Sequence, residues 1–393
     1  MQKNGHALFF REKLTENGGK REKVGKRIAE FVKRETVLSA AAVLAVVSCF
    51  FVTPDREYLG YIDFRTLILL FCLMTVMAGF KQMGVFRILS AGLLRRVKSG
   101  RGLALCLVFL CFFCSMVITN DVSLVTFVPF GLLALEMAGM ERQICAAVTF
   151  MTIGANLGSM LTPIGNPQNL YLYGRSGMGA LSFVALMLPY AALSALMLAG
   201  AILLAFRKET VSCQVERPAA PPKKRLILYL ALFAVCLLTV SGVLPEGALL
   251  VIVLAAVLID RRELLAEVDY GLLLTFAAFF VFIGNMGRLP QFRGFLESVL
   301  TGNERIAAVA ASQVISNVPA ALLLSGFTDQ WRELIIGTNL GGLGTLIASM
   351  ASLISYKQIA VRHPEKKGPY LIFFTVWNVV FLAVLLAASF LLG

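Results

Sequence analysis

The chain has 393 residues, of which 58% are hydrophobic and 15% are charged. Soluble domains carry about 25% charged residues, so this composition excludes an ordinary water-soluble protein, and the mean hydropathy of +0.80 agrees. The apolar residues form runs of about 17 to 25, the length that a helix needs to cross a bilayer. A membrane β-barrel would instead alternate apolar and polar residues over segments of about 10. The sequence therefore predicts an all-α polytopic membrane protein.

The net charge of +13 comes from 36 basic and 23 acidic residues. Ten of the basic residues lie in segment 1–35, which we interpret as a basic cytoplasmic tail. With the spans described below, 29 of the 36 fall on the side of this tail and 7 on the other. Cytoplasmic loops are enriched in Lys and Arg. We therefore expect a multi-pass protein of the cell (inner) membrane with a cytoplasmic N-terminus, whose basic residues face a lipid bilayer and not nucleic acid.

Taken in chain order, nine apolar segments are predicted to cross the membrane: 36–53, 64–82, 143–173, 177–206, 226–242, 245–260, 270–287, 332–356 and 369–392. Two further apolar pairs, at about 102–138 and 304–327, are interrupted in the middle by Thr119-Asn120-Asp121 and by Ser316-Asn317-Val318-Pro319. Polar turns at membrane depth occur only where they are buried in protein or face a wet cavity. We interpret both pairs as re-entrant helical hairpins.

A short repeat relates two halves of the chain. Segments Gly154–Gly165 and Gly337–Ala348 are identical at six of twelve aligned positions, and each follows a hairpin. The extra span at 226–242 lies between the copies, so the second copy is expected upside down relative to the first. This order predicts the inverted repeat of a secondary transporter. Its parts are a first half at 36–206 with a broken helix at about 143–173, a cytoplasmic linker at 207–225, and a second half at 243–393 with a broken helix at about 332–356.

The two hairpin tips are candidate sites. We expect Asn120 and Asn317 to be N-caps of the second helix of each hairpin. A half-helix N-terminus attracts an anion, and the carbonyls that end the preceding half-helix attract a cation. The alternative is that both asparagines only cap helix breaks between packed spans.

The repeated glycine-rich segments are expected to form the second wall of the site, because glycine loosens a helix and frees its carbonyls. Their side chains add oxygen ligands, which a hard alkali cation prefers: Asn156, Thr162, Asn339 and Thr345. Pro163 cannot donate a backbone hydrogen bond, and Asn166 before Pro167 predicts that a helix restarts there. The alternative is that the glycines allow membrane helices to pack closely.

Asp121 is the one acid that the predicted spans place deep in the membrane, where an ionisable group is costly and indicates function. It can bind a cation or carry a proton. The alternative is a hydrated acid on the first turn of a half-helix. Four other acids fall at span ends, where we expect them to be solvated: Glu136, Glu141, Asp260 and Asp269.

Enzyme and ATPase signatures are missing from the sequence. It has no His-Glu-x-x-His motif and no Walker motif, and the only histidines, His6 and His363, lie in polar segments. We therefore expect no enzyme and no cofactor, with Na⁺ as a candidate bound ion, and the driving energy must come from an ion gradient.

The two Asn tips, each followed by a Gly-x-Asn-x-Gly segment, and the block Thr162-Pro-Ile-Gly-Asn-Pro-Gln-Asn169 resemble the ion transporter superfamily. This superfamily includes divalent anion:sodium symporters, citrate carriers, arsenite efflux permeases and some Na⁺/H⁺ antiporters. The resemblance covers most of residues 36–392. It implies a scaffold domain and a mobile transport domain that works as an elevator, commonly in a homodimer.

The resemblance also implies site residues. One ion site would contain Thr119, Asn120 and Gly154, and the other would contain Ser316, Asn317 and either Gly337 or Thr338. Further candidate ion ligands are Asp121, Asn156 and Asn339. The substrate would contact residues at the tips and in the glycine-rich segments: Asn120, Asp121, Asn317, Val318, Thr162, Pro163 and Thr345.

The third position of each tip departs from the symporter pattern of Ser-Asn-Thr, because Asp121 and Val318 replace threonine. An Asn-Asp tip is closer to the arsenite and Na⁺/H⁺ branch, whereas the Thr-Pro-Ile-Gly-Asn-Pro block is closer to the anion carriers. We expect a secondary active transporter, coupled to Na⁺ or H⁺, for a small anion or oxyanion such as a dicarboxylate, sulfate or arsenite. The alternatives are a Na⁺/H⁺ antiporter and, more remotely, an intramembrane enzyme.

Overall fold

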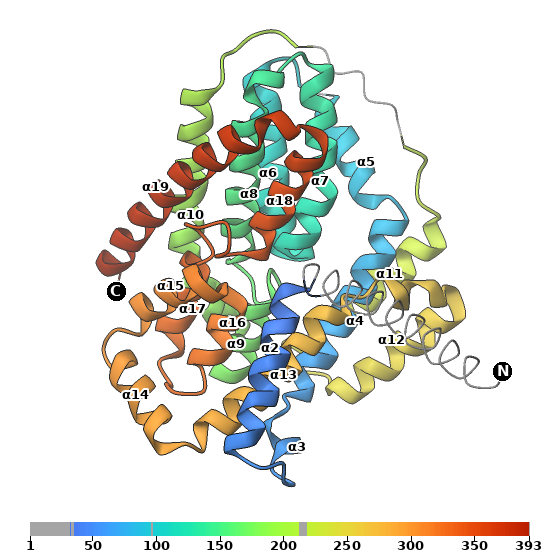
Figure 1. The fold of residues 1–393 in the computed structure, drawn as a ribbon. Helices are drawn as coiled ribbons and strands as arrows, with labels where there is room; N and C mark the ends of the chain where they lie inside the picture. Colours follow the sequence, from blue (N-terminus) through green and yellow to red (C-terminus); the bar gives the residue numbers. More distant parts are fainter. Residues whose placement is uncertain (1–31, 33–34, 96, 212–217, 393) are drawn as a thin grey trace, which may run out of the picture. The chain divides into compact units, whose positions relative to one another are not determined.

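The computed structural model describes residue 32 and residues 35–95, 97–211 and 218–392 (Figure 1). Within these ranges the chain is helical, with no β-strand and one isolated antiparallel bridge between Ser99 and Thr210. The predicted all-α class is confirmed. The predicted basic tail lies almost wholly outside the described residues, as does 212–217 of the predicted linker.

The described part of the chain forms two compact units, of which the smaller contains residue 32, residues 35–62 and residues 270–285. Its helices are α2 (Thr36–Phe51), α3 (Tyr58–Tyr61) and most of α13 (Tyr270–Gly287). Buried Asn285 on α13 joins them, because its Nδ2 donates to Ser48 Oγ at 2.9 Å and to Tyr58 Oη at 2.8 Å. A polar tie of this kind holds apolar helices at one register.

The larger unit contains two similar sets of four helices. The first set is α6 (Gly100–Ile118), α7 (Asn120–Met137), α8 (Ile144–Ser159) and α9 (Pro167–Ser176). The second set is α15 (Glu304–Ile315), α16 (Asn317–Leu324), α17 (Trp331–Leu340) and α18 (Met350–Arg362). In each set the first two helices form the hairpin, and the last two form a helix that is broken in its middle.

The two sets exchange their last helices. Helix α18 packs on α7 and α8 of the first set, whereas α9 packs on α16 and α17 of the second (Figure 1). Each hairpin is therefore covered by the far half of the other set's broken helix. Neither set has its complete packing without the other.

The remaining helices of the larger unit are α4 (Phe64–Gln82), α5 (Val85–Leu94), α10 (Ala180–Ala205), α11 (Lys223–Val240), α12 (Glu246–Asp260), α14 (Pro290–Leu300) and α19 (Lys367–Leu391), with 3-10 turns at Glu141–Gln143, Arg262–Glu267 and Pro364–Lys366. Helices α5 and α14 were not predicted. Both have 10 or 11 residues and mix polar with apolar side chains, so neither resembles a span.

The two hairpins differ in the length of their helices. Among the described residues, six segments are long and apolar enough to cross a membrane: α4, α6, α7, α10, α13 and Pro364–Leu391. Helices α15 and α16 have 12 and 8 residues, or about 18 and 12 Å at 1.5 Å per residue. Since the hydrocarbon core is about 30 Å thick, neither of these two helices can cross it alone.

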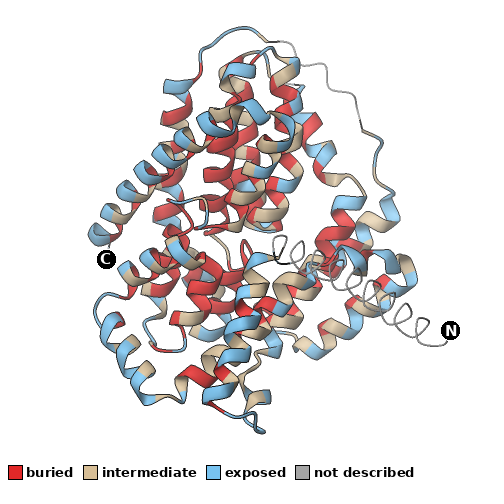
Figure 2. Ribbon diagram, in the orientation of Figure 1, coloured by how far each residue is buried: buried red, intermediate tan, exposed pale blue. Residues whose placement is uncertain are grey.

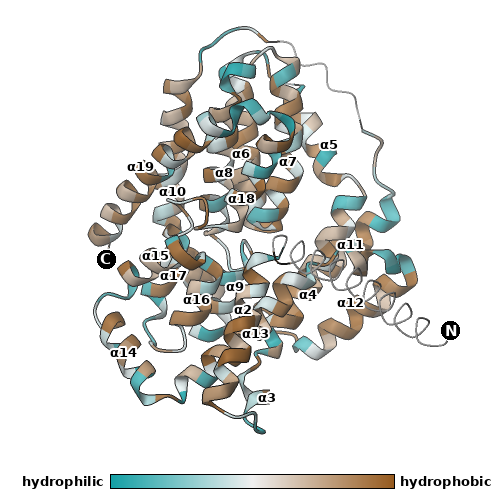
Figure 3. Ribbon diagram, in the orientation of Figure 1, coloured by the Kyte–Doolittle hydropathy of each residue, from teal (hydrophilic) through white to brown (hydrophobic). Residues whose placement is uncertain are grey.

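The outer helices expose apolar side chains as a membrane protein must. On α19, Ile372 and Leu391 are 70% and 88% exposed, and on α10 Leu196 is 71% exposed. Figures 2 and 3 show α19 as largely exposed and largely apolar along its length. Exposed apolar surface of this extent is expected where lipid replaces water as the solvent.

The first hairpin packs on α8 through glycine. A methyl group on Gly158 would lie 2.0 Å from the carbonyl oxygen of Phe112 and 2.7 Å from Ser115 Oγ, both on α6. Gly341 occupies the same place in the second set, where a methyl group would lie 2.6 Å from Ser312 Oγ. The close approach of backbones makes both glycines packing residues.

We predict that Gly158→Ala destabilises the protein by about 2 kcal/mol or more, because α8 must move away from α6 to admit the methyl group. Gly200→Ala on α10 is the matched control, since a methyl group there has no neighbour within 4 Å. Unfolding in detergent followed by circular dichroism measures both. Equal stability of the two variants would contradict the packing role of Gly158.

Candidate functional site

The two hairpin tips share one unusual backbone conformation. Thr119 has φ 69° and ψ 152°, and Ser316 has φ 73° and ψ 154°. They are the only non-glycine residues with positive φ in the described part of the chain. This region of backbone space is essentially reserved for glycine, and a side chain there costs on the order of 1–3 kcal/mol. Such strain persists only where the surroundings enforce it, and it clusters at functional sites.

The prediction that Asn120 and Asn317 are N-caps is wrong by one residue. Helices α7 and α16 begin at Asn120 and Asn317, and the residue in the capping position is Thr119 or Ser316, whose side chain makes no capping hydrogen bond. The Oδ1 of Asn120 instead accepts from the adjacent N–H of Asp121 at 3.0 Å.

Each tip is held by the break in its own broken helix. The N–H of Asn120 donates to the carbonyl of Gly165 at 3.1 Å, and the N–H of Asn317 donates to the carbonyl of Ala348 at 3.0 Å. Gly165 and Ala348 are aligned positions of the sequence repeat. Both tips therefore make the same contact with equivalent residues.

A second pair of equivalent bonds ties each break to the first helix of its hairpin. Thr162 Oγ1 donates to the carbonyl of Met116, and Thr345 Oγ1 donates to the carbonyl of Gln313 at 3.1 Å. Both threonines were predicted as substrate or ion ligands. In this structure their hydroxyls bond protein carbonyls, with Thr162 half-buried and Thr345 exposed.

The two repeated asparagines cross between the halves. Asn156 on α8 accepts at Oδ1 from Ser349 Oγ at 3.1 Å, and Asn339 on α17 accepts at Oδ1 from Asn166 Nδ2 at 3.1 Å. Asn156 aligns with Asn339 in the repeat, and the same offset pairs Asn166 with Ser349. Each asparagine thus bonds the residue that begins the other half's second helix segment. We call these four residues, three with amide side chains and one serine, the crossed amide pairs.

The crossed amide pairs connect the two tips. Asn156 Oδ1 also accepts from Asn120 Nδ2 at 3.1 Å, and its Nδ2 donates to the carbonyl of Gly342 at 3.4 Å. A methyl group on Gly342 would lie 2.9 Å from Asn317 Nδ2, so the second tip lies against the same glycine. Asn120, Asn156 and Asn317 are each 5% exposed. The predicted ligands Asn120, Asn156, Asn317 and Asn339 therefore lie in one buried polar cluster.

The carbonyls freed by the breaks already have donors in this structure. In the first break, Asn169 Nδ2 donates to the carbonyls of Met160 at 3.3 Å and Thr162 at 3.2 Å. In the second break, Gln313 Nε2 donates to the carbonyls of Gly341 at 3.0 Å and Leu343 at 2.9 Å. A cation that used these carbonyls would have to displace an amide.

Asp121 follows the first tip on the first turn of α7. Its side chain is half-buried, and its Oδ1 is buried without a hydrogen-bond partner among the described residues. A buried carboxylate oxygen without a partner is costly. The atom is therefore available to a ligand that the chain itself does not supply.

Other predicted site residues have structural surroundings. A methyl group on Gly154 would lie 3.1 Å from the carbonyl of Val108, and one on Gly337 would lie 2.6 Å from the carbonyl of Arg305, so both glycines pack against the first hairpin helix of their set. Thr338 donates within its own helix to the carbonyl of Leu334 at 2.7 Å. Pro163 and Val318 are buried.

Ion pairs that the sequence analysis missed lie at helix ends. Glu136 and Asp260, which were expected to be solvated, are half-buried and form ion pairs. Glu136 at the end of α7 pairs with Arg362 at the end of α18 at 2.5 Å and contacts His363 Nε2 at 2.9 Å. Asp260 pairs with Arg225 at 3.0 Å. The partners are more than 30 positions apart, so no local pattern indicates them.

The site also contains residues that the sequence analysis did not assign to it. Asn166 caps α9 by accepting from the N–H of Asn169 at 2.9 Å, which confirms the predicted restart before Pro167. Its role in crossing to Asn339, and the roles of Ser349 and Gln313, were not predicted. Extending the repeat alignment by one residue would have paired Ser349 with Asn166.

Comparison with known proteins gives a family and several relatives. The sequence profile of the citrate transporter family matches residues 26–328. The chain is 35% identical to an uncharacterized transporter of Methanocaldococcus jannaschii over 306 residues, which cover 77% of this chain and 82% of that protein. It is 32% identical to inner membrane protein YbiR of Escherichia coli over 320 residues, which cover 80% and 86%. It is 36% identical to silicon efflux transporter LSI3 of Oryza sativa over 150 residues, which cover 38% and 30%.

We predict that Asn339 and Asn166 are energetically coupled, because removing either side chain leaves a buried amide group of the other without its partner. A double-mutant cycle with Asn339→Ala and Asn166→Ala should give a coupling energy of about 1 kcal/mol or more. Combining Asn339→Ala with Ser241→Ala, at an exposed position, should be additive. Free energies of unfolding in mixed micelles provide the measurement, and additivity for the Asn339–Asn166 pair would show that the crossing bond contributes nothing.

Proposed function

This chain belongs to the citrate transporter family, and we propose that it is an ion-coupled secondary active transporter that moves a small anion or oxyanion by alternating access. Membership of the family makes it a membrane transporter and not an enzyme, as the sequence predicted. The proposal adds the coupling, the class of substrate and the place where the substrate binds.

One observation carries the proposal: two strained, non-glycine helix starts in the same conformation meet a single buried polar cluster. Thr119 and Ser316 are strained alike, and the helices that follow them begin at Asn120 and Asn317. Asn120 donates to Asn156, and Asn317 lies against Gly342. Asn156 in turn donates to the carbonyl of Gly342, so the two tips are connected through these two residues. Helix N-termini that converge in an apolar protein favour an anion, because each presents about half a positive charge.

An inverted repeat with two re-entrant hairpins accounts for this convergence. Helices α15 and α16 are too short to cross a bilayer, which supports re-entry of the second hairpin. The first hairpin shares its tip conformation and its contact with the helix break, which supports the same arrangement there. We further propose a cytoplasmic N-terminus in the inner membrane, an elevator movement of a transport domain against a scaffold, and a homodimer, in line with the superfamily that the motifs resemble.

The substrate proposal rests on the cluster's chemistry and on the relatives' names. The cluster consists of neutral amides, hydroxyls and helix N-termini, with one acid, Asp121, next to it in the chain, so it suits a small polar anion better than an apolar ligand. The family is named for citrate, and the rice relative is named for silicon efflux. We propose a dicarboxylate, sulfate or arsenite-like oxyanion, coupled to Na⁺ or H⁺ that binds beside the tips.

The proposed function is tested by uptake into proteoliposomes from a panel of labelled dicarboxylates, citrate, sulfate, phosphate and arsenite, with and without a gradient of Na⁺ or H⁺. We predict uptake of at least one member that depends on a gradient. Asn120→Ala and Asn317→Ala should each nearly abolish it while leaving the protein folded, since each change removes a side chain of the cluster.

Asn303→Ala is the matched control for both tip variants, because Asn303 is exposed and its side chain caps nothing. It should transport at the wild-type rate. Uptake that both tip variants retain would make the tips structural, and uptake of no anion by the wild-type protein would refute anion transport.

Asp121 supports a second candidate function, Na⁺/H⁺ antiport. Its buried Oδ1 has no partner among the described residues, and the start of α7 stabilises a carboxylate there through the helix dipole. A charged Asp121 would serve as a cation ligand in either function. The two functions differ in whether an organic or inorganic anion moves with the cation.

We predict that Asp121→Asn at least halves the dependence of transport on the coupling ion, because a neutral amide binds a cation less strongly than a carboxylate. Thr126→Val is the matched control, since Thr126 Oγ1 on the same helix is also buried without a partner among the described residues. Gradient-driven uptake and counterflow are measured side by side. Unchanged ion and pH dependence in Asp121→Asn would exclude both the cation-binding and the proton-carrying role.

A further inference from the structure

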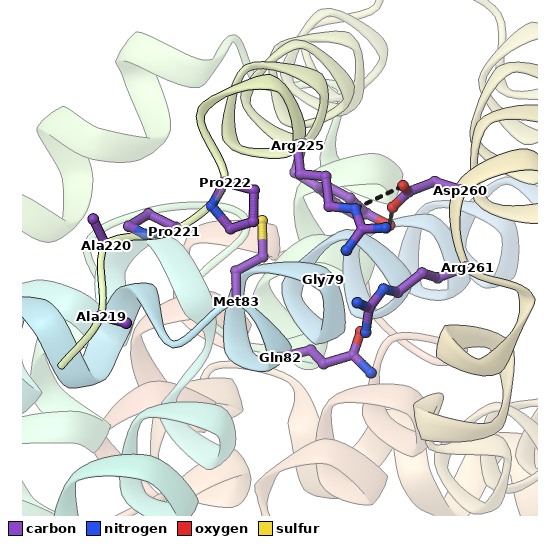
Figure 4. Close-up of a pocket in the computed structure, with 11 residues that line it drawn as sticks. Gly79, Gln82, Met83, Ala219, Ala220, Pro221, Pro222, Arg225, Asp260 and Arg261 are labelled. Atoms are coloured by element: carbon purple, nitrogen blue, oxygen red, sulfur yellow. Dashed lines mark hydrogen bonds and ion pairs between the residues drawn. The ribbon is translucent and has the colours of Figure 1, made fainter.

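A cavity away from the polar cluster lies between three helix ends of the larger unit. It has a volume of about 250 Å³ and is formed by the end of α4, the start of α11, the end of α12 and the linker residues Ala219–Pro222 (Figure 4). The polar side chains in its wall belong to Gln82, Arg225, Tyr229, Asp260 and Arg261. None of these residues takes part in the proposed transport site.

The charges in the cavity wall do not balance. Arg225 Nε pairs with Asp260 Oδ1 at 3.0 Å. The side chain of Arg261 forms no ion pair or hydrogen bond with another residue in the described ranges, and it points toward Gln82 beside the Arg225 guanidinium (Figure 4). The wall therefore has two guanidinium groups and one carboxylate, which leaves one positive charge without a partner. A guanidinium presents its N–H donors in a planar fork that matches phosphate oxygens.

The first arginine is held in place by a chain of contacts that reaches the core. Tyr229 is 1% exposed, and its hydroxyl donates to Asp260 Oδ2 at 3.2 Å. The ring of Tyr229 occupies the space of a missing side chain at Gly79, where a methyl group would lie 2.1 Å from the ring. The carboxylate that orients Arg225 is thus itself oriented by a buried ring. A cation held in this way is preorganised for a ligand.

The helices that form the cavity also expose apolar side chains that a lipid could contact. Ile227 on α11 is 67% exposed, and Ile259 on α12 is 87% exposed. Each lies within two residues of a charged residue of the wall, Arg225 or Asp260. Exposed apolar surface on the helices that hold an unbalanced cation, at helix ends on the side where the basic loops predict the cytoplasm, is the arrangement of an interfacial headgroup site.

We propose that this cavity binds the phosphate group of an anionic phospholipid, with Arg225 and Arg261 as the two donors and with the acyl chains against the apolar residues of α11 and α12. The same phosphate chemistry could come from inorganic phosphate in solution. The exposed apolar residues of α11 and α12 favour the lipid. The site is independent of the transported substrate and of its coupling ion.

The test compares Arg261→Gln with Arg262→Gln in the full-length protein. Arg262 is the matched control, because it has the same charge, is exposed and does not line the cavity. Native mass spectrometry of the purified protein, titrated with phosphatidylglycerol or with phosphatidylcholine, measures the dissociation constant for the first bound lipid. Melting temperatures without added lipid establish that both variants fold.

We expect Arg261→Gln to weaken phosphatidylglycerol binding by about tenfold or more, because a hydrogen bond to a charged group is lost. Arg262→Gln should bind as the wild type does, and phosphatidylcholine should bind equally weakly to all three. Equal affinities of the two variants for phosphatidylglycerol would overturn the proposal. Protection of the wild type against thermal unfolding by inorganic phosphate alone, to the same degree as by phosphatidylglycerol, would overturn the assignment to a lipid.

Discussion

A helix that breaks inside a hydrocarbon layer leaves carbonyl and N–H groups that lipid cannot satisfy, and the larger unit is built around this constraint. The breaks after Ser159 and Leu340 free carbonyls, which Asn169 and Gln313 satisfy. The tips supply N–H groups that the carbonyls of Gly165 and Ala348 accept. The broken backbone of each half is thus completed by hydrogen bonds within that half, and the crossed amide pairs then join the halves.

The same bonds explain how strain at the tips can persist. A residue such as Thr119 would relax to a commoner conformation if the helix after it could shift by part of a turn. The bond from Asn120 to Gly165 on one side and the bond to Asn156 on the other fix the start of α7. The strain is therefore stored in a site whose neighbours are amides. Amides can exchange a protein partner for a ligand without a change of charge, so the ion and the anion proposed above would take over hydrogen bonds that these side chains make with one another.

Much of this architecture could be predicted from the sequence. The parts that could not be predicted share one cause. Four predicted spans, at 64–82, 177–206, 270–287 and 369–392, follow from apolar run length. The tips and the restart before Pro167 follow from polar residues where an apolar run should continue. The repeat aligns Asn156 with Asn339, but an alignment shows only which residues are equivalent. It does not show which residues are in contact. That each asparagine bonds the opposite half depends on the exchange of α9 and α18, a tertiary arrangement. The pairs of Glu136 with Arg362 and of Asp260 with Arg225 were missed for the same reason, and the capping error arose because a positive φ at Thr119 is enforced from outside the tip.

The exchange of α9 and α18 has a consequence for synthesis at the ribosome. Helices α7 and α8 are complete once residue 159 has been made, whereas the helix that covers them ends at residue 362. At about 5–20 residues per second, the interval of about 200 residues lasts on the order of 10–40 seconds. During that time Asn156 has no Ser349 to bond, and the buried face of the first hairpin must be shielded by neighbouring early helices, by water or by the insertion machinery. The nascent first half is therefore an intermediate whose packing is completed only when the last third of the chain has been made.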